Sequence, residues 1–176
     1  IVGGGMVGII AGFMLNKKGL KVAIIEADRI IQGTTAHTTA KVTSQHGLSY
    51  GKIKKKLGEE SARQYADANE TAISTIFEIA RDNGIDCDFE WTDAFVYTQD
   101  DKYIKKIIDE VEAASAFGIK ASYRDSLAFP FEIKAAVCFE GQARFHPRKF
   151  LLGLADKFVQ QGGKIFEKTR AIDIIE

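Results

Sequence analysis

The chain opens with Ile1-Val2-Gly3-Gly4-Gly5-Met6-Val7-Gly8, where Gly3, Gly5 and Gly8 take the spacing Gly-x-Gly-x-x-Gly. In such a motif the first glycine permits a tight turn, and the second lets the backbone approach a pyrophosphate. The third lets the following helix pack closely on a strand. Phosphates are favoured at the start of that helix, because its N–H groups are unpaired there and the helix dipole is positive. The run therefore predicts a turn that holds the phosphates of a dinucleotide.

The residues after the turn supply the context that the motif requires. Met6–Lys18 is apolar nearly all round, as expected of a helix buried against a sheet, and Gly19 ends it. Lys21–Ala27 predicts a short parallel strand, with Glu26 at its end. A carboxylate at that place can accept hydrogen bonds from both ribose hydroxyls of an adenosine. The order strand, helix, strand therefore predicts dinucleotide binding, although the motif alone does not separate FAD from NAD.

The rest of the chain alternates between helical and extended patterns. The interval 32–51 is rich in glycine, threonine and serine and lacks a clear period, so we expect a long loop, and loops of that length tend to be functional. We expect helices over 52–83, 103–117 and 148–161, and strands within 86–99, 119–123, 134–140, 164–168 and 171–175. The sequence therefore predicts an α/β fold.

Composition and charge exclude several classes of partner. The chain has 24 basic and 24 acidic residues, whereas a nucleic-acid or membrane surface needs a basic excess, so we expect neither partner. No apolar stretch reaches the length of a membrane span, and no secretory signal precedes the first motif. Cys87 and Cys138 are too far apart in sequence to give a metal or redox spacing, which favours the reducing cytoplasm. We therefore expect a cytoplasmic protein that binds small molecules and holds no metal in this chain.

The loop after Glu26 favours FAD over NAD. It contains Gly33-Thr34-Thr35-Ala36-His37-Thr38-Thr39-Ala40-Lys41-Val42-Thr43, which is dominated by small and hydroxylated side chains. Their N–H and O–H groups can donate hydrogen bonds to a pyrophosphate or a flavin, and their small size permits close approach. A nicotinamide enzyme usually continues from the acidic residue into another strand–helix crossover. An ordinary mobile loop is the alternative explanation.

Taken together, these motifs resemble the D-amino-acid oxidase/glycine oxidase-like family of FAD-dependent oxidoreductases. The similarity extends to Phe145-His146-Pro147, which stands before the predicted helix that leads to Gly162-Gly163. His37-Thr38-Thr39-Ala40-Lys41-Val42-Thr43 and Gly84-Ile85-Asp86-Cys87-Asp88-Phe89 are similar to a bacterial subgroup whose members often carry a C-terminal Rieske 2Fe-2S domain. The resemblance implies FAD as the cofactor, with a 2Fe-2S cluster in a C-terminal domain outside this chain.

The family's architecture implies how the chain is divided. It implies a Rossmann-like FAD-binding domain over 1–84 and 142–176, interleaved with part of an α+β substrate domain over 85–141. Both ends of the chain look cut, so we expect the N-terminal part of a longer protein. The family's substrate-binding residues and the last glycine-rich stretch that covers the flavin lie mostly in the second half. We therefore name no catalytic residue, and we expect this part alone to be inactive and to retain little or no FAD.

The resemblance also implies which residues contact the cofactor. Met6 and Val7 would lie at the pyrophosphate, Glu26 and Ala27 at the adenosine, and Ala171 would offer a backbone contact to the adenine. Thr34, Thr35, Thr39, Ala40 and Lys41 would lie along the phosphates and the flavin, although a solvated role for the lysine fits equally well. The full set of expected contacts is Gly3, Gly5, Met6, Val7, Gly8, Glu26, Ala27, Thr34, Thr35, His37, Thr39, Ala40, Lys41 and Ala171.

His37 has two interpretations. Some amine dehydrogenases of the superfamily attach FAD covalently through a histidine in a similar loop, and Gly33-Thr34-Thr35-Ala36-His37 resembles that arrangement. We favour a histidine that only forms hydrogen bonds near the flavin, because most family members bind FAD non-covalently and histidine serves many roles. Acid precipitation of the full-length protein separates the two, since only a covalent flavin stays with the pellet.

The implied chemistry is amine or amino-acid oxidation. The substrate Cα–H delivers a hydride to flavin N5, which gives an imine that water hydrolyses, while the protein supplies position and electrostatics. Two alternatives remain open, namely an NAD(P)-dependent dehydrogenase that uses the same glycine turn and a non-catalytic nucleotide-binding module. A visible flavin spectrum distinguishes the first hypothesis from both.

For several other residues we favour a structural role. His146 stands before a predicted helix, which indicates a role at the helix entry. Cys87 lies among apolar residues and is expected to be a small buried side chain. Trp91 and Tyr97 alternate at strand spacing, and we expect them to pack in the core. Gly12, where the family usually has alanine, should lower helix propensity without touching the ligand.

Overall fold

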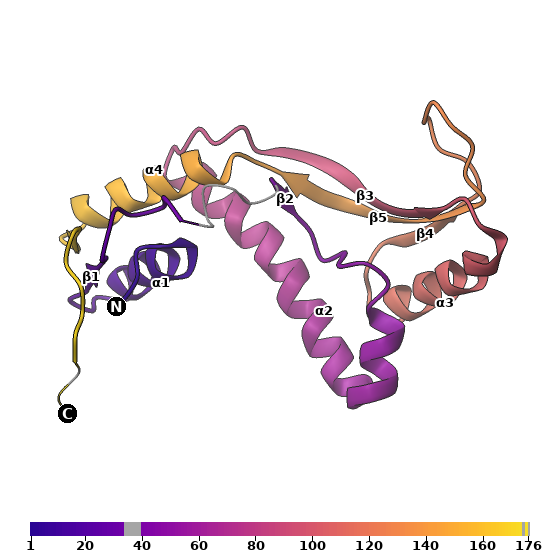
Figure 1. The fold of residues 1–176 in the computed structure, drawn as a ribbon, viewed down its shortest axis with the longest axis horizontal. Helices are drawn as coiled ribbons and strands as arrows, with labels where there is room; N and C mark the ends of the chain where they lie inside the picture. The colour runs from indigo at the N-terminus through magenta and orange to yellow at the C-terminus, as the bar shows by residue number, and fades with distance from the viewer. Residues whose placement is uncertain (34–39, 174, 176) are drawn as a thin grey trace. The chain divides into compact units, whose positions relative to one another are not determined.

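The computed structural model describes residues 1–33, 40–173 and 175. Its mixed order of helices and strands confirms the α/β class predicted from the sequence (Figure 1). The elements are α1 (Met6–Lys17), β1 (Ala23–Ile25), β2 (Lys41–Val42), α2 (Tyr50–Asp82), β3 (Glu90–Thr98), η2 (Asp101–Tyr103), α3 (Ile104–Ser115), β4 (Ala121–Arg124), β5 (Ala135–Arg144), α4 (Pro147–Gln160) and β6 (Lys164–Phe166).

The chain divides into two compact units. The first unit comprises residues 1–40, 78–89 and 145–176, and the second comprises 41–77 and 90–144. Each unit is therefore assembled from stretches that are separated in the sequence. The expected division into an FAD-binding domain and a substrate domain, with boundaries near 84 and 142, concerns function rather than compactness and stays a prediction.

The first unit contains the strand–turn–helix–strand arrangement predicted from the glycine motif. β1 pairs in parallel with β6, from Ala23 opposite Lys164 to Ile25 opposite Phe166. Val2 makes a parallel bridge with Ile25, so the glycine turn begins beside the end of β1. α1 leads from this turn to β1 and packs on both β1 and α4.

The packing of α1 is close on one face and absent on the other. A methyl group on Gly12 would lie 2.8 Å from Cδ1 of Ile24 and 3.6 Å from a ring carbon of Phe158, so the missing side chain has a packing reason that the sequence does not indicate. The sequence of α1, apolar nearly all round, does not indicate that part of the helix is open to solvent, where Val7 is 81% exposed and Met14 is 40% exposed. Within the part of the chain that the structure describes, α1 is covered on the face that meets β1 and α4.

The second unit is an antiparallel sheet with helices on one face. β5 is its central strand and pairs with β3 along one edge and with β4 and β2 along the other. The short strand β2 lies inside the interval that was expected to be loop, where Lys41 pairs with Arg144. The core of this unit is formed by the sheet, α2, α3 and the turn after α3, and its buried residues include Tyr50, Ala62, Ile107, Phe117, Val137 and Phe139.

Two features of α2 are not revealed by the sequence: an interruption at Gly58 and the partner of its first amides. Gly58 has φ 86° and ψ 169°, so α2 is two helical segments joined at a glycine rather than the single helix predicted. The buried carboxylate of Glu110 accepts hydrogen bonds from the backbone N–H groups of Ser49 at 2.6 Å, Tyr50 at 2.9 Å and Gly51 at 3.2 Å. Glu110 thus satisfies amides that a helix start leaves unpaired.

Two expectations about apolar segments are wrong. Residues 171–173 and 175 do not form the predicted strand, and Ile172 is 93% exposed. An apolar run becomes a strand only where another strand offers backbone partners. Trp91 and Tyr97 are 47% and 44% exposed rather than part of the core, although Tyr97 contacts the rings of Phe129 and Phe131. Alternation along a strand identifies a face without showing that the face is covered.

Candidate dinucleotide-binding site

Three glycines of the turn resist replacement, Gly3 because of its backbone conformation and Gly4 and Gly8 because an added side chain would have no room. Gly3 has φ +101°, a conformation that L side chains rarely adopt. A methyl group on Gly8 would lie 1.9 Å from the carbonyl oxygen of Gly3, and one on Gly4 would lie 2.5 Å from Cγ2 of Ile30. The geometry therefore matches the roles assigned to the first and third glycines of the motif, and it adds Gly4, whose requirement the motif does not predict.

The start of α1 presents the backbone N–H groups of a helix N-terminus at the end of the glycine turn. Gly5 is the N-cap residue and, being glycine, has no side chain to cap the helix, and the first turn contains no acidic residue. The first amides of a helix lack partners within the helix, and the positive end of its dipole favours an anion. This set of donors fits the pyrophosphate of a dinucleotide.

The carboxylate of Glu26 points back at the glycine turn. Its Oε2 accepts a hydrogen bond from the Gly4 N–H at 2.8 Å, and its Oε1 accepts one from the Asp28 N–H at 2.9 Å. The Asp28 amide, followed by the Gly4 amide, holds the pKa of Glu26 below its ordinary value. Glu26 is thus an ionised carboxylate at neutral pH, and each of its oxygens keeps a lone pair for a further donor such as a ribose hydroxyl.

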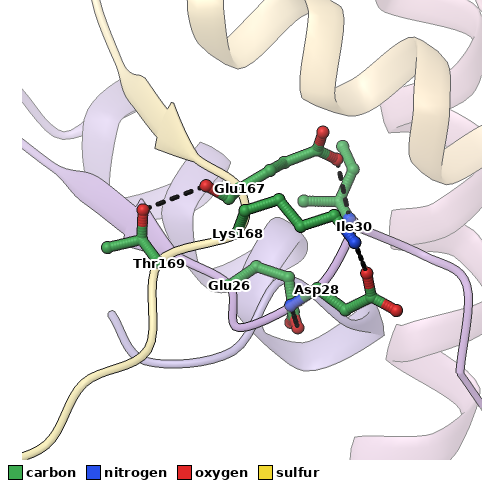
Figure 2. Close-up of polar contacts among 6 residues, drawn as sticks. All are labelled: Glu26, Asp28, Ile30, Glu167, Lys168 and Thr169. Carbon is green, nitrogen blue, oxygen red and sulfur yellow. Dashed lines mark hydrogen bonds and ion pairs between the residues drawn. The ribbon is translucent and has the colours of Figure 1, made fainter.

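A second segment, residues 167–169 after β6, lies along the loop that follows β1, as Figure 2 shows. The Lys168 N–H donates to the Asp28 carbonyl at 2.8 Å, and the Thr169 N–H donates to the Glu26 carbonyl at 2.9 Å. The Ile30 N–H donates to Oε1 of Glu167 at 2.9 Å. Nζ of Lys168 forms an ion pair with the Asp28 carboxylate, which lowers the pKa of that carboxyl group. We call residues 167–169 the clasp.

The remaining expected contacts fall into three groups. Ala27 is exposed beside Glu26, and Ala171 is exposed two residues after Thr169, so both belong to the same end of β1. Ala40 accepts a hydrogen bond from the Phe145 N–H at 2.9 Å, and Lys41 begins β2 in the second unit. The third group lies outside the described residues and consists of Thr34, Thr35, His37 and Thr39.

Other side chains with competing interpretations have structural roles in the described residues. Nδ1 of His146 accepts a hydrogen bond from the Lys149 N–H at 3.4 Å, and Pro147 follows at the first position of α4, which confirms the helix-entry role. Cys87 is buried, as expected, and burial raises the pKa of its thiol. Within the described ranges no three His, Cys, Asp or Glu side chains come together as a metal site. Among the same described residues, no helix has the length and apolar character needed to cross a bilayer.

A glycine turn before a helix, with a carboxylate aimed back at the turn from the next strand, defines a dinucleotide-binding α/β protein. The chain belongs to the DAO family of FAD-dependent oxidoreductases, whose model matches residues 1–176.

Individual relatives agree with this assignment. The chain is 41% identical over 174 residues to the putative Rieske 2Fe-2S iron-sulfur protein YhfW of Bacillus subtilis, covering 99% of this chain and 34% of the relative. Among solved structures, L-proline dehydrogenase from P. horikoshii is similar with a TM-score of 0.77 at 19% identity, covering 99% of this chain and 44% of that one. Glycine oxidase from Geobacillus kaustophilus gives 0.76 at 19% identity, with 99% and 47% covered. The chain thus spans less than half the length of these relatives.

Proposed function

We propose that the protein containing this chain is an FAD-dependent oxidoreductase that oxidises an amine or an amino acid. The observation that carries the proposal is the hydrogen bond of the Glu26 carboxylate to the glycine turn that leads into α1. The names of two structurally similar proteins, L-proline dehydrogenase and glycine oxidase, support an amino acid as the class of substrate. At 19% identity, these two proteins share the fold of this chain, and the support for the substrate class comes from their names.

The chain's residues would hold and orient the cofactor. The turn amides of Gly5, Met6, Val7 and Gly8 bind the pyrophosphate, and Glu26 accepts hydrogen bonds from the ribose. When bound, FAD takes up the hydride that leaves the substrate Cα. The other proposed contacts lie at the adenosine, the phosphates or the flavin, and they are Gly3, Ala27, Thr34, Thr35, His37, Thr39, Ala40, Lys41 and Ala171.

The full-length protein tests this function directly. We expect a purified preparation with the visible absorbance of bound flavin, and we expect amines or amino acids from a panel to bleach that absorbance in the absence of oxygen. A colourless protein that binds NAD(P) would contradict the cofactor assignment. A flavin that is bleached only by alcohols or hydroxy acids would contradict the substrate class.

Two wider proposals follow from the relatives and the cysteines. The name of the B. subtilis relative, a putative Rieske 2Fe-2S protein, supports a 2Fe-2S cluster elsewhere in the longer protein, which iron analysis of that protein would test. Both cysteines of the chain are free and buried, which supports a reducing compartment such as the cytoplasm. Fractionation of cells that express the protein would test the location.

A further inference from the structure

We propose that the clasp is part of the nucleotide site, because Glu167 and Lys168 position the Glu26 carboxylate for the ribose of the adenosine half. The inference rests on the proposed function, since it assumes that an adenosine binds at Glu26. It assigns Glu167, Lys168 and Asp28 as positioning residues that act through Glu26 rather than by contact with the ligand.

The first step is the backbone. β1 ends at Ile25, yet its pairing with the segment after β6 continues beyond that residue. The Glu26 N–H donates to the Phe166 carbonyl at 2.8 Å, and the Glu26 carbonyl accepts from the Thr169 N–H at 2.9 Å. Both backbone groups of Glu26 are therefore fixed by residues 166–169, which sets the point from which its side chain extends.

The second step runs from Glu167 to the side chain of Glu26. Oε1 of Glu167 holds the Ile30 N–H at 2.9 Å. The side chain of Ile30 lies against Gly4, where an added methyl group would be 2.5 Å from its Cγ2. The adjacent Ile31 N–H donates to the Gly4 carbonyl at 3.1 Å, and the Gly4 N–H donates to Oε2 of Glu26 at 2.8 Å. Glu167 is thus connected through Ile30, Ile31 and Gly4 to Oε2 of Glu26.

The third step concerns the other carboxylate oxygen. Oε1 of Glu26 accepts from the Asp28 N–H, while the Asp28 carbonyl and carboxylate are both held by Lys168. Lys168 is 66% exposed and Asp28 is 67% exposed, and ion pairs so open to solvent add little to stability. Lys168 also has φ 52°, which is uncommon for a residue other than glycine. The Lys168–Asp28 ion pair is therefore better explained by its effect on the orientation of the loop after β1 than by a contribution to stability (Figure 2).

The test measures recognition of the ribose. Apoprotein of full natural length is titrated calorimetrically with ADP and with 2′-deoxy-ADP, which lacks one of the hydroxyls that Glu26 would bind. We expect the wild type to prefer ADP by about tenfold, the size of one hydrogen bond to a charged group. Glu167→Met, which removes the acceptor, should weaken ADP binding by about tenfold and bring the preference close to one. Glu167→Gln keeps an acceptor oxygen and should retain the preference.

The lysine has a matched control in the same unit. Lys149 forms another exposed ion pair, with Asp88 at 2.8 Å. Lys168→Met should reduce the preference for ADP over 2′-deoxy-ADP, whereas Lys149→Met should leave it unchanged. If the Glu167→Met and Lys168→Met proteins keep the wild-type preference, the inference is overturned, even when both ligands bind more weakly. A wild type that binds neither ADP nor FAD would instead overturn the proposed function, and the inference with it.

Discussion

At the scale of single residues, Gly8 is the position of the turn that has the least room for a side chain. Replacing it with alanine places a methyl group 1.9 Å from the Gly3 carbonyl oxygen, and a backbone atom cannot move aside as a side chain can. We expect Gly8→Ala to lower the free energy of unfolding by about 1–3 kcal/mol, measured by urea denaturation. Gly51→Ala is the control, because the nearest atoms to an added methyl group are 3.8 Å and 4.0 Å away. This substitution should raise the free energy of unfolding by about 0.5–1 kcal/mol. Equal effects of the two substitutions would contradict the crowded turn.

Glu26 predicts a pH dependence of stability. Its pKa is lowered in the folded chain by the Asp28 and Gly4 amides. The stabilisation is therefore fully present above the unfolded carboxyl pKa and is lost as the pH falls through the lower folded value. We expect the advantage of the wild type over Glu26→Gln in free energy of unfolding to shrink below about pH 4. Urea denaturation of both proteins between about pH 6 and pH 3 measures it, and an advantage that grows on acidification would refute the assignment.

The same residues show how far a motif can be used for prediction. Gly8 and Glu26 could be singled out from the sequence, because the dinucleotide-binding motif places a glycine and an acidic residue at nearly fixed spacing along one strand–helix–strand unit. Glu167 was not predictable, since 137 residues separate it from Ile30 and only the parallel pairing of β1 with β6 brings the two together. A carboxylate just after a strand has no pattern that distinguishes it from a solvated one.

At the scale of elements, the packing of α1 on β1 can be tested by a pair of substitutions. A methyl group on Gly12 would meet Cδ1 of Ile24 at 2.8 Å, so Gly12→Ala should destabilise the wild type or leave its stability unchanged despite alanine's better helix propensity. Ile24→Val removes that carbon but keeps Cγ1, 3.3 Å from the added methyl group, so in its background Gly12→Ala should be more favourable than in the wild type. We expect a coupling energy of at least about 0.5 kcal/mol in the double-mutant cycle. Additive effects would show that α1 and β1 are not in close contact at this point.

Most helices and strands were predicted from local patterns, whereas the short strand β2 and the interruption of α2 were not. The long helices follow from apolar periodicity, which their own residues carry. β2 consists of Lys41 and Val42 only, and it is a strand because Arg144 and Ala143 of β5 pair with it. The interruption of α2 at Gly58 was also unpredictable, because a glycine within a helical pattern is usually tolerated at a modest cost.

At the scale of the whole molecule, the α/β class could be predicted, whereas composition alone does not mark every boundary between the compact units. The class follows from the order of the elements along the chain. The unit boundaries follow residues 40, 77, 89 and 144. The boundaries after 77 and 144 fall within the helix α2 and at the end of the strand β5, where no linker composition appears. The described residues after Arg170 show the same limit, since the exposed Ile172 has strand-like neighbours in the sequence but no strand in the fold.

The distribution of contacts predicts how the 176-residue chain behaves by itself. Its described residues contain the glycine turn, Glu26 and the clasp, whereas the resemblance to the family places much of the flavin-ring site in the second half, and the chain spans 47% of the glycine oxidase it resembles. The chain alone should therefore bind ADP but lose FAD on gel filtration, leaving little visible absorbance in the protein peak. A chain extended to the length of its relatives is the control and should stay yellow. One flavin per chain in the 176-residue protein would show instead that these residues hold the whole cofactor.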